Sequence, residues 1–180
     1  MPVLIALLRG VNVGGNVLKM ERLREICAKL GAENPRTYVQ SGNVVFEAAG
    51  AAAEWEAKLE KKLTGESRLP VSVIVRTAAE MNKVLGGNPF LREKGIDTAR
   101  VAVSFLQQPP AESALAALSA LEIGRERFHH AGRELYIHCP DGFADSKLYA
   151  LDKVLKQRPT TRNWNTVTKL SEMSAKSSKA

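Results

Sequence analysis

A run of residues near the C-terminus places an aromatic ring among cationic and amide side chains. Residues 159–169 read PTTRNWNTVTK, which brings Arg162, Asn163 and Trp164 together. The face of an indole ring can stack on a nucleic-acid base, and a guanidinium can bind phosphate or carboxylate. The alternative is a structural anchor, with the Trp164 ring buried between two halves of the protein. The run predicts one of these two roles.

A second segment has the residue types of an anion-binding turn. It begins at Arg9 and holds Asn12, Gly14 and Gly15 shortly before an expected helix. Backbone N–H groups of a glycine-rich turn beside a helix N-terminus bind anions, and Arg9 and Asn12 add a cation and an amide. The motif lacks the Gly-Lys-Ser/Thr ending of a P-loop and the glycine spacing of a dinucleotide fold. Turn geometry alone is the alternative explanation for the glycines.

A third polar segment lies between two β-rich runs and reads Gln40-Ser41-Gly42-Asn43. Glycine at this position favours a tight hairpin turn, which is the simplest interpretation of the segment. The amides of Gln40 and Asn43 flank the turn and can donate and accept hydrogen bonds. Gln40, Ser41 and Asn43 are therefore candidate ligand-binding residues.

Lys147 is the remaining candidate contact. It follows the turn Pro140-Asp141-Gly142 and comes directly after Ser146, which we expect to cap a helix. Lys147 or Asp141 would transfer protons if the protein is an enzyme. No catalytic triad, carboxylate pair or metal-ligand spacing accompanies them, so we expect no metal and assign no cofactor. The three histidines lie in or beside expected strands, whose alternation allows them to be exposed: His129, His130 and His138.

The charge of the chain suggests an anionic partner. The 180 residues carry a net charge of +7, and residues 125–180 hold 11 lysines and arginines against six acidic residues. A basic surface attracts nucleic acids and other anions, although surplus surface lysines are an equally good explanation. The composition, 44% hydrophobic and 25% charged, is that of a folded globular protein.

The chain has no segment that would take it into or across a membrane. Its longest apolar run, Val3 to Leu8, fits a buried strand, and the N-terminus lacks the features of a secretory signal. We therefore expect a cytoplasmic protein without a disulfide. Cys27 falls on the apolar side of an expected helix, and core packing is the favoured interpretation for both cysteines. Cys139 precedes a turn, so exposure is the alternative for that residue.

The hydrophobic pattern of the first half predicts the element order βαββαβ. Expected strands cover residues 3–8, 37–40, 44–46 and 71–75, and expected helices cover residues 20–30 and 55–63. This order is the split βαβ arrangement of a ferredoxin-like sandwich. A third helix over residues 78–85 leads into a Gly-Gly-Asn-Pro break.

The second half predicts a related βαββα order. Expected strands cover residues 101–106, 127–130 and 135–138, with helical stripes around Leu115–Leu121 and Leu148–Leu155 and a short helix from Thr166. The fold class is thus α+β with two subdomains, over residues 1–85 and 100–172. Residues 86–99 would connect them, and residues 173–180 would form a flexible tail because they are rich in serine, alanine and lysine.

Several long motifs resemble a bacterial family known as domain of unknown function 1697. They are residues 5–15, IALLRGVNVGG; residues 36–46, RTYVQSGNVVF; the Pro140-Asp141-Gly142 turn with Ser146-Lys147; and residues 160–167, TTRNWNTV. The resemblance covers nearly the whole chain and implies a two-part α+β protein with a ferredoxin-like N-terminal half. It implies no activity, ligand or catalytic residue.

These observations lead to one main hypothesis and two alternatives. The main one is a protein that binds a nucleic acid or a phosphorylated, base-containing ligand in a single polar cleft. Only Phe46 is aromatic along the expected central strands, so a nucleic acid would bind at loops rather than on the sheet. The cleft would be formed by Arg9, Asn12, Gln40, Asn43, Arg162, Asn163 and Trp164. The alternatives are an enzyme that holds a small anionic metabolite with Arg9 or Arg162, and a non-catalytic interaction module.

Overall fold

The computed structural model describes residues 1–67, 70–149 and 151–177 of the chain. The chain forms two compact units. Unit 1 consists of residues 1–83 together with the chain from residue 169 onward, and unit 2 consists of residues 84–168. Within the described residues, no helix is long and apolar enough to cross a bilayer.

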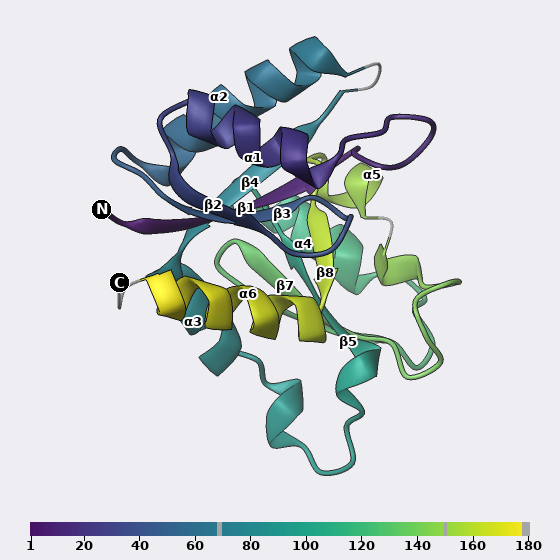
Figure 1. Ribbon diagram of the computed structural model, residues 1–180. Helices are drawn as coiled ribbons and strands as arrows, with labels where there is room; N and C mark the ends of the chain where they lie inside the picture. The colour runs from purple at the N-terminus through teal and green to yellow at the C-terminus, as the bar shows by residue number, and fades with distance from the viewer. Residues whose placement is uncertain (68–69, 150, 178–180) are drawn as a thin grey trace. The chain divides into compact units, whose positions relative to one another are not determined.

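Unit 1 is a four-stranded antiparallel sheet with strand order β2-β3-β1-β4 (Figure 1). This is the order of a ferredoxin-like sandwich, and the predicted βαββαβ order of the first half is confirmed. The elements are β1 (Val3–Arg9), α1 (Met20–Lys29), β2 (Glu33–Thr37), β3 (Asn43–Glu47), α2 (Ala52–Glu66), β4 (Ser72–Thr77) and α3 (Ala78–Gly86).

The core of unit 1 lies between one face of the sheet and helices α1 and α2, which lie side by side (Figure 1). Alternate residues of β1 point into this core because successive side chains of a strand face opposite sides. Trp55, Leu59 and Leu63 enter it from α2 at four-residue intervals. The Trp55 indole N–H donates to the Ala49 carbonyl over 2.8 Å, so the ring is buried with its polar atom satisfied.

Unit 2 repeats the arrangement with strand order β6-β7-β5-β8, also antiparallel. Its main elements are β5 (Val101–Phe105), α4 (Glu112–Ser119), β6 (Arg127–Ala131), β7 (Glu134–His138), α5 (Asp152–Leu155), β8 (Thr160–Asn163) and the start of α6 (Trp164–Ser177). Helices α4 and α5 contact each other and share a core with the sheet. That core includes Leu106, Leu118, Leu135, Ile137, Leu148, Leu151 and Leu155.

Four elements differ from the sequence-based expectation. A closing strand, β8, completes unit 2 where we expected only a helix; its polar side chains gave no apolar signal, yet it pairs with β5 along its whole length. The leucines expected on one helix are divided: Leu148 lies on a 3-10 turn (Lys147–Tyr149), Leu151 is the N-cap residue of α5 and Leu155 lies on α5. Strand β2 covers Glu33–Thr37 rather than residues 37–40. Helix α6 continues to Ser177, so residues 173–177 are helical, while residues 178–180 of the expected tail lie outside the described residues.

Candidate functional site

The topology of unit 1 brings two of the predicted polar segments to the same edge of its sheet. Strands β1 and β3 are antiparallel, so the end of β1 lies beside the turn that precedes β3. The Leu8 N–H donates to the Gly42 carbonyl over 2.8 Å and joins the two segments directly. We call residues 10–19 and 38–42 together the loop edge.

The glycine-rich part of the loop edge is a tight two-residue turn. The Asn16 N–H donates to the Val13 carbonyl over 2.9 Å, and φ is 56° at Gly14 and 80° at Gly15. Two consecutive positive φ angles are those of a type I′ turn, which explains why glycine occupies both positions. Both glycines are exposed, and in the described part of the chain their N–H groups have no acceptor.

The Asn12 side chain holds the two segments of the loop edge together. Its Nδ2 donates to the Gln40 carbonyl over 2.5 Å and to the Leu18 carbonyl over 3.1 Å. Its Oδ1 accepts from the Leu18 N–H over 2.9 Å. The Asn12 side chain therefore stabilises the loop structure. It fixes the positions of the neighbouring residues in both segments of the loop edge.

The hairpin turn before β3 is fixed in the same way. Asn43 is fully buried, and its Nδ2 donates to the Tyr38 carbonyl over 2.9 Å and to the Ser41 hydroxyl over 3.0 Å. A Cβ on Gly42 would lie 2.6 Å from the Val11 side chain, so only glycine fits there. Gln40 and Ser41 remain exposed. The buried Asn43 side chain therefore stabilises the turn from inside, and Gln40 and Ser41 form its solvent-exposed tip.

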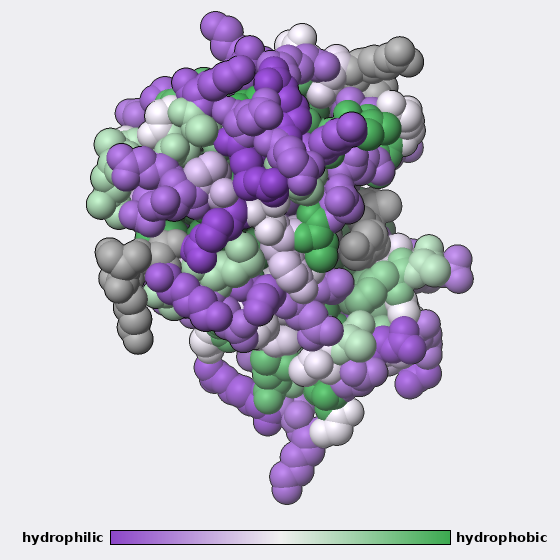
Figure 2. Space-filling view, viewed as in Figure 1, coloured by the Kyte–Doolittle hydropathy of each residue, from purple (hydrophilic) through white to green (hydrophobic). Residues whose placement is uncertain are grey.

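Three valines on the loop edge are exposed, which the polar motifs alone did not indicate. Val17 is 78% exposed, Val13 56% and Val39 49%. Figure 2 shows hydrophobic atoms over the loop between β1 and α1, among hydrophilic neighbours. Val39 also has a φ of 51°, a conformation that is rare and strained for a β-branched residue. The loop edge therefore combines exposed peptide groups with exposed apolar side chains on a braced backbone.

Two cations lie at the loop edge or beside it. Arg9 is half-buried at the end of β1, opposite Ser72 of β4. Lys19 is exposed and is the N-cap residue of α1, a helix that has no side-chain cap hydrogen bond. The positive end of the helix dipole adds to the charge of Lys19.

The predicted segment of unit 2 is largely explained by local structure. The Asn163 Oδ1 accepts from the Thr166 N–H over 2.8 Å and caps α6. Arg162 lies on β8 and donates to the Thr161 carbonyl over 3.0 Å. Trp164 is 7% exposed, so little of its ring is open to solvent. Arg162, Asn163 and Trp164 belong to unit 2 and the loop edge to unit 1, so their convergence on one cleft stays a prediction.

Lys147 and Asp141 also have partners inside unit 2. The Lys147 Nζ donates to the Glu122 carbonyl over 2.5 Å, and Asp141 forms an ion pair of 2.8 Å with Arg125. Ser146 accepts from the Leu148 N–H over 3.1 Å, as expected of a capping residue. Their use in proton transfer stays a prediction.

Sequence analysis missed the environment of His138. The alternation of the strands allowed an exposed side chain, but His138 is only 8% exposed, and its ring centroid lies 5.7 Å from that of Phe90. The Arg127 Nη2 lies 3.2 Å from its Nδ1, and because a guanidinium can only donate, Nδ1 accepts and Nε2 carries the proton. Arg127 also holds Glu93 through two hydrogen bonds of 3.1 and 2.9 Å.

Burial lowers the pKa of His138, and the nearby charge of Arg127 lowers it further. Both effects disfavour the charged imidazolium. Hydrogen bonding to Arg127 lowers the pKa of Glu93. The Phe90 ring comes from a 3-10 helix (Phe90–Arg92) that is distant in the sequence, so the alternation within the β6–β7 hairpin did not reveal its contact with His138.

Both cysteines are free and buried. Core packing, the favoured interpretation for both, is confirmed, and Cys139 lies within the core of unit 2. Burial raises the pKa of Cys27 to about 12 and also raises that of Cys139. In both cases burial favours the neutral thiol over the thiolate. Across the described ranges, no cluster of histidine, cysteine and carboxylate side chains is suited to a metal ion.

The architecture defines an α+β protein made of two ferredoxin-like units, each with a four-stranded antiparallel sheet and helices packed on it.

Within this class, the chain belongs to the family described as "Protein of unknown function (DUF1697)", whose model matches residues 1–136. The resemblance inferred from the motifs is thereby confirmed. The structure is similar to that of the conserved bacterial protein SP0830 from Streptococcus pneumoniae, with a TM-score of 0.76 and 23% sequence identity. The similarity covers 97% of this chain and 99% of that chain, and it shows a common fold. A comparison with proteins of curated function found no match.

Proposed function

We propose that the protein binds a nucleic acid or a phosphorylated, base-containing ligand at the loop edge of unit 1. The observation that carries the proposal is the exposed Gly14-Gly15 turn, whose N–H groups point to no acceptor in the described chain. Free peptide N–H groups of a glycine-rich turn are suited to phosphate oxygens.

The neighbouring side chains supply the other contacts that such a ligand needs. Lys19 and Arg9 provide positive charge, and the exposed Ser41 hydroxyl and Gln40 amide can hydrogen-bond a sugar or base. Exposed Val13, Val17 and Val39 offer an apolar surface to the uncharged part of the ligand. The bracing by Asn12 keeps these groups in place before the ligand arrives, which reduces the ordering cost of binding.

Binding of a fluorescent single-stranded octauridylate, measured at several salt concentrations, tests the proposal. Lys19→Gln should weaken binding and reduce the slope of log affinity against log salt by about 0.7 if Lys19 neutralises one phosphate. The Gln40→Ala/Ser41→Ala double variant should lose about tenfold in affinity. Lys83→Gln removes an exposed charge from α3 and serves as the control. Affinity that does not change with salt would remove the proposal.

The same titration tests whether unit 2 contributes to this site. Arg162→Ala should weaken octauridylate binding about as much as Lys19→Gln if the predicted cleft includes both units. Unchanged affinity would assign the ligand to the loop edge alone.

A second candidate is a protein-interaction module at the same edge, favoured by the three exposed valines. Its binding would depend on Val17 and Val39 and only weakly on salt, which separates it from the first candidate. Either function fits a cytoplasmic protein with reduced thiols, which remains our expectation for its location.

A further inference from the structure

A hollow between α1 and α2 is a separate candidate site inside unit 1. Its volume is about 380 Å³. Pockets for small ligands span roughly 300–1,000 Å³, so the hollow has the size for a small molecule. Its lining consists of Leu30, Lys58, Lys61, Lys62, Gly65 and Glu66.

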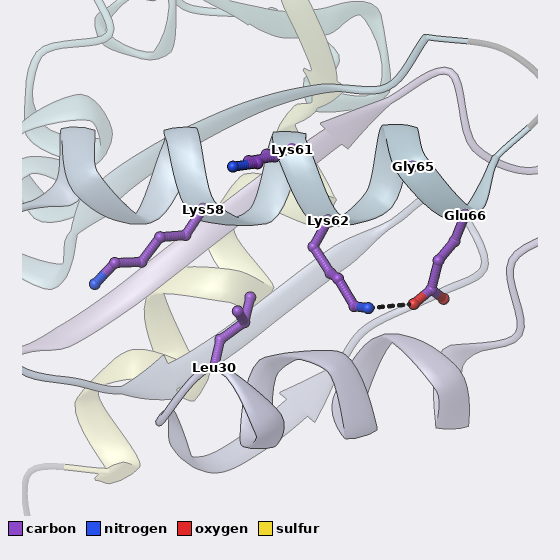
Figure 3. Close-up of a pocket in the computed structure, with 6 residues that line it drawn as sticks. All are labelled: Leu30, Lys58, Lys61, Lys62, Gly65 and Glu66. Carbon is purple, nitrogen blue, oxygen red and sulfur yellow. Dashed lines mark ion pairs between the residues drawn. The ribbon is translucent and has the colours of Figure 1, made fainter.

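The floor of the hollow is apolar. Leu30 packs partly against the core of unit 1 and, as Figure 3 shows, points from the end of α1 towards the gap below α2. The stems of Lys58 and Lys62 descend from α2 towards the same gap (Figure 3). Lysine stems cover apolar surface while their ammonium groups stay in water.

Gly65 lines the hollow and leaves open space there. Neither its backbone conformation nor its packing requires glycine. Its φ is not positive, and a Cβ added there would meet no atom within 4 Å. Gly65 lies in the last turn of α2 and leaves open space where another residue would place a side chain.

The charge at the rim is positive. Glu66 is the one carboxylate in the lining, and it is already bound by Lys62 Nζ at 3.0 Å and by Arg22 Nη2 at 2.9 Å. These two partners lower the pKa of Glu66, so it stays ionised and paired. Lys58 lies over the Trp55 ring at 5.4 Å. Within residues 1–67, 70–149 and 151–177, neither Lys58 nor Lys61 has a carboxylate partner.

We propose that this hollow binds a small amphipathic anion. Its apolar body would lie on Leu30 and the lysine stems, over the space left by Gly65. Its carboxylate or phosphate head would pair with Lys58 and Lys61. The site is independent of the loop edge, because its lining shares no residue with residues 10–19 or 38–42.

Titration of the ¹⁵N-labelled full chain with decanoate and with decyl phosphate, followed by amide chemical shifts, tests this proposal. Both probes are used below their aggregation concentrations, and decanol is the uncharged control. We expect saturable shifts at the amides of residue 30 and residues 58–66, with weaker binding of decanol. The tighter of the two anions identifies the head group that the site prefers.

Two variants probe the two halves of the site. Lys58→Gln/Lys61→Gln should weaken binding of the preferred anion about fivefold, as expected for two exposed ion pairs. Gly65→Leu should also weaken it, by filling the hollow. Lys94→Gln/Lys153→Gln removes two exposed charges from unit 2 and should leave the affinity unchanged.

Three results would overturn the proposal. They are the absence of saturable shifts at these amides with both anions, wild-type affinity in Lys58→Gln/Lys61→Gln, and decanol binding as tightly as decanoate. A glutamate-rich peptide that shifts these amides when neither anion does would also overturn it, since the occupant would then be a protein segment.

Discussion

At the scale of single residues, Val39 combines a left-handed backbone conformation with a β-branched side chain that disfavours it. A left-handed conformation costs an ordinary L-residue about 1–2 kcal/mol and suits asparagine better than a β-branched residue. Val39 adopts it with φ at 51° while leaving 49% of its surface exposed. Strain of this kind persists only where the surroundings impose it, and it often accompanies function.

Val39→Asn should therefore raise the free energy of unfolding, by about 0.5–1 kcal/mol, in urea denaturation. The matched control is Val17→Asn on the same loop edge, where the residue is more exposed and has no positive φ. The control should change stability by less than about 0.5 kcal/mol. A loss of stability in Val39→Asn would mean that Val39 contributes packing that outweighs its strain.

His138 predicts a dependence of stability on pH. Its pKa is lowered in the folded state, so the unfolded chain takes up the proton first. Stability is unaffected above the ordinary histidine pKa of about 6.5 and falls as the pH decreases from there through the lowered pKa.

The variant His138→Gln cannot titrate but can still accept a hydrogen bond from Arg127. The decrease in unfolding free energy between pH 7 and pH 5 should be smaller in this variant than in the wild type. His129→Gln is the control, because His129 is exposed on the neighbouring strand β6. Equal pH dependence in all three proteins would contradict the role given to His138.

At the scale of elements, α6 depends on a single side-chain cap. Asn163→Ala removes the acceptor for the Thr166 N–H and should cost about 1 kcal/mol of stability, measured by thermal or urea unfolding. Asn165→Ala, one residue inside the helix and exposed, should be neutral or slightly stabilising because alanine favours helix. If the two variants behave alike, the cap contributes nothing.

The elements with a strong apolar pattern were predictable from the sequence, and those with a polar one were not. Strand β1 and helix α2 carry buried side chains at regular intervals, so their existence followed directly. Strand β8 consists of Thr160, Thr161, Arg162 and Asn163, and its identity comes from pairing with β5. The Ser104 and Thr161 hydroxyls, 2.6 Å apart across that pair, stabilise it without any signal in the local sequence.

The candidate site was predictable only in part, for a related reason. The segments around Asn12 and Asn43 were identified by residue type, but both amides turn out to brace loops. The exposed valines were missed because an isolated apolar residue in a loop carries no periodicity. Hydrogen bonds to backbone groups elsewhere in the chain, such as that from Asn12 to Gln40, decide which side chains of a polar motif face solvent. The local sequence does not show these bonds.

At the scale of the whole molecule, unit 1 includes residues from both ends of the sequence. The Arg36 Nη2 donates to the Met173 carbonyl over 2.7 Å, and the Ser171 hydroxyl donates to Asn82 over 2.7 Å. Ending the chain after Thr168 should therefore speed amide hydrogen exchange in β2 and α3 by about tenfold or more. Strand β7 of unit 2 is the internal reference. Faster exchange in β7 alone would contradict the assignment of the C-terminal residues to unit 1.

Amide chemical shifts test most directly whether the loop edge binds a phosphorylated, base-containing ligand, as we propose. Titrating the ¹⁵N-labelled protein with octauridylate at low salt should shift the amides of Gly14, Gly15 and Ser41 first and most. The shifts should shrink as salt is added, because phosphate contacts release counterions. Shifts that are absent from these three amides, or confined to residues 58–66, would contradict the claim.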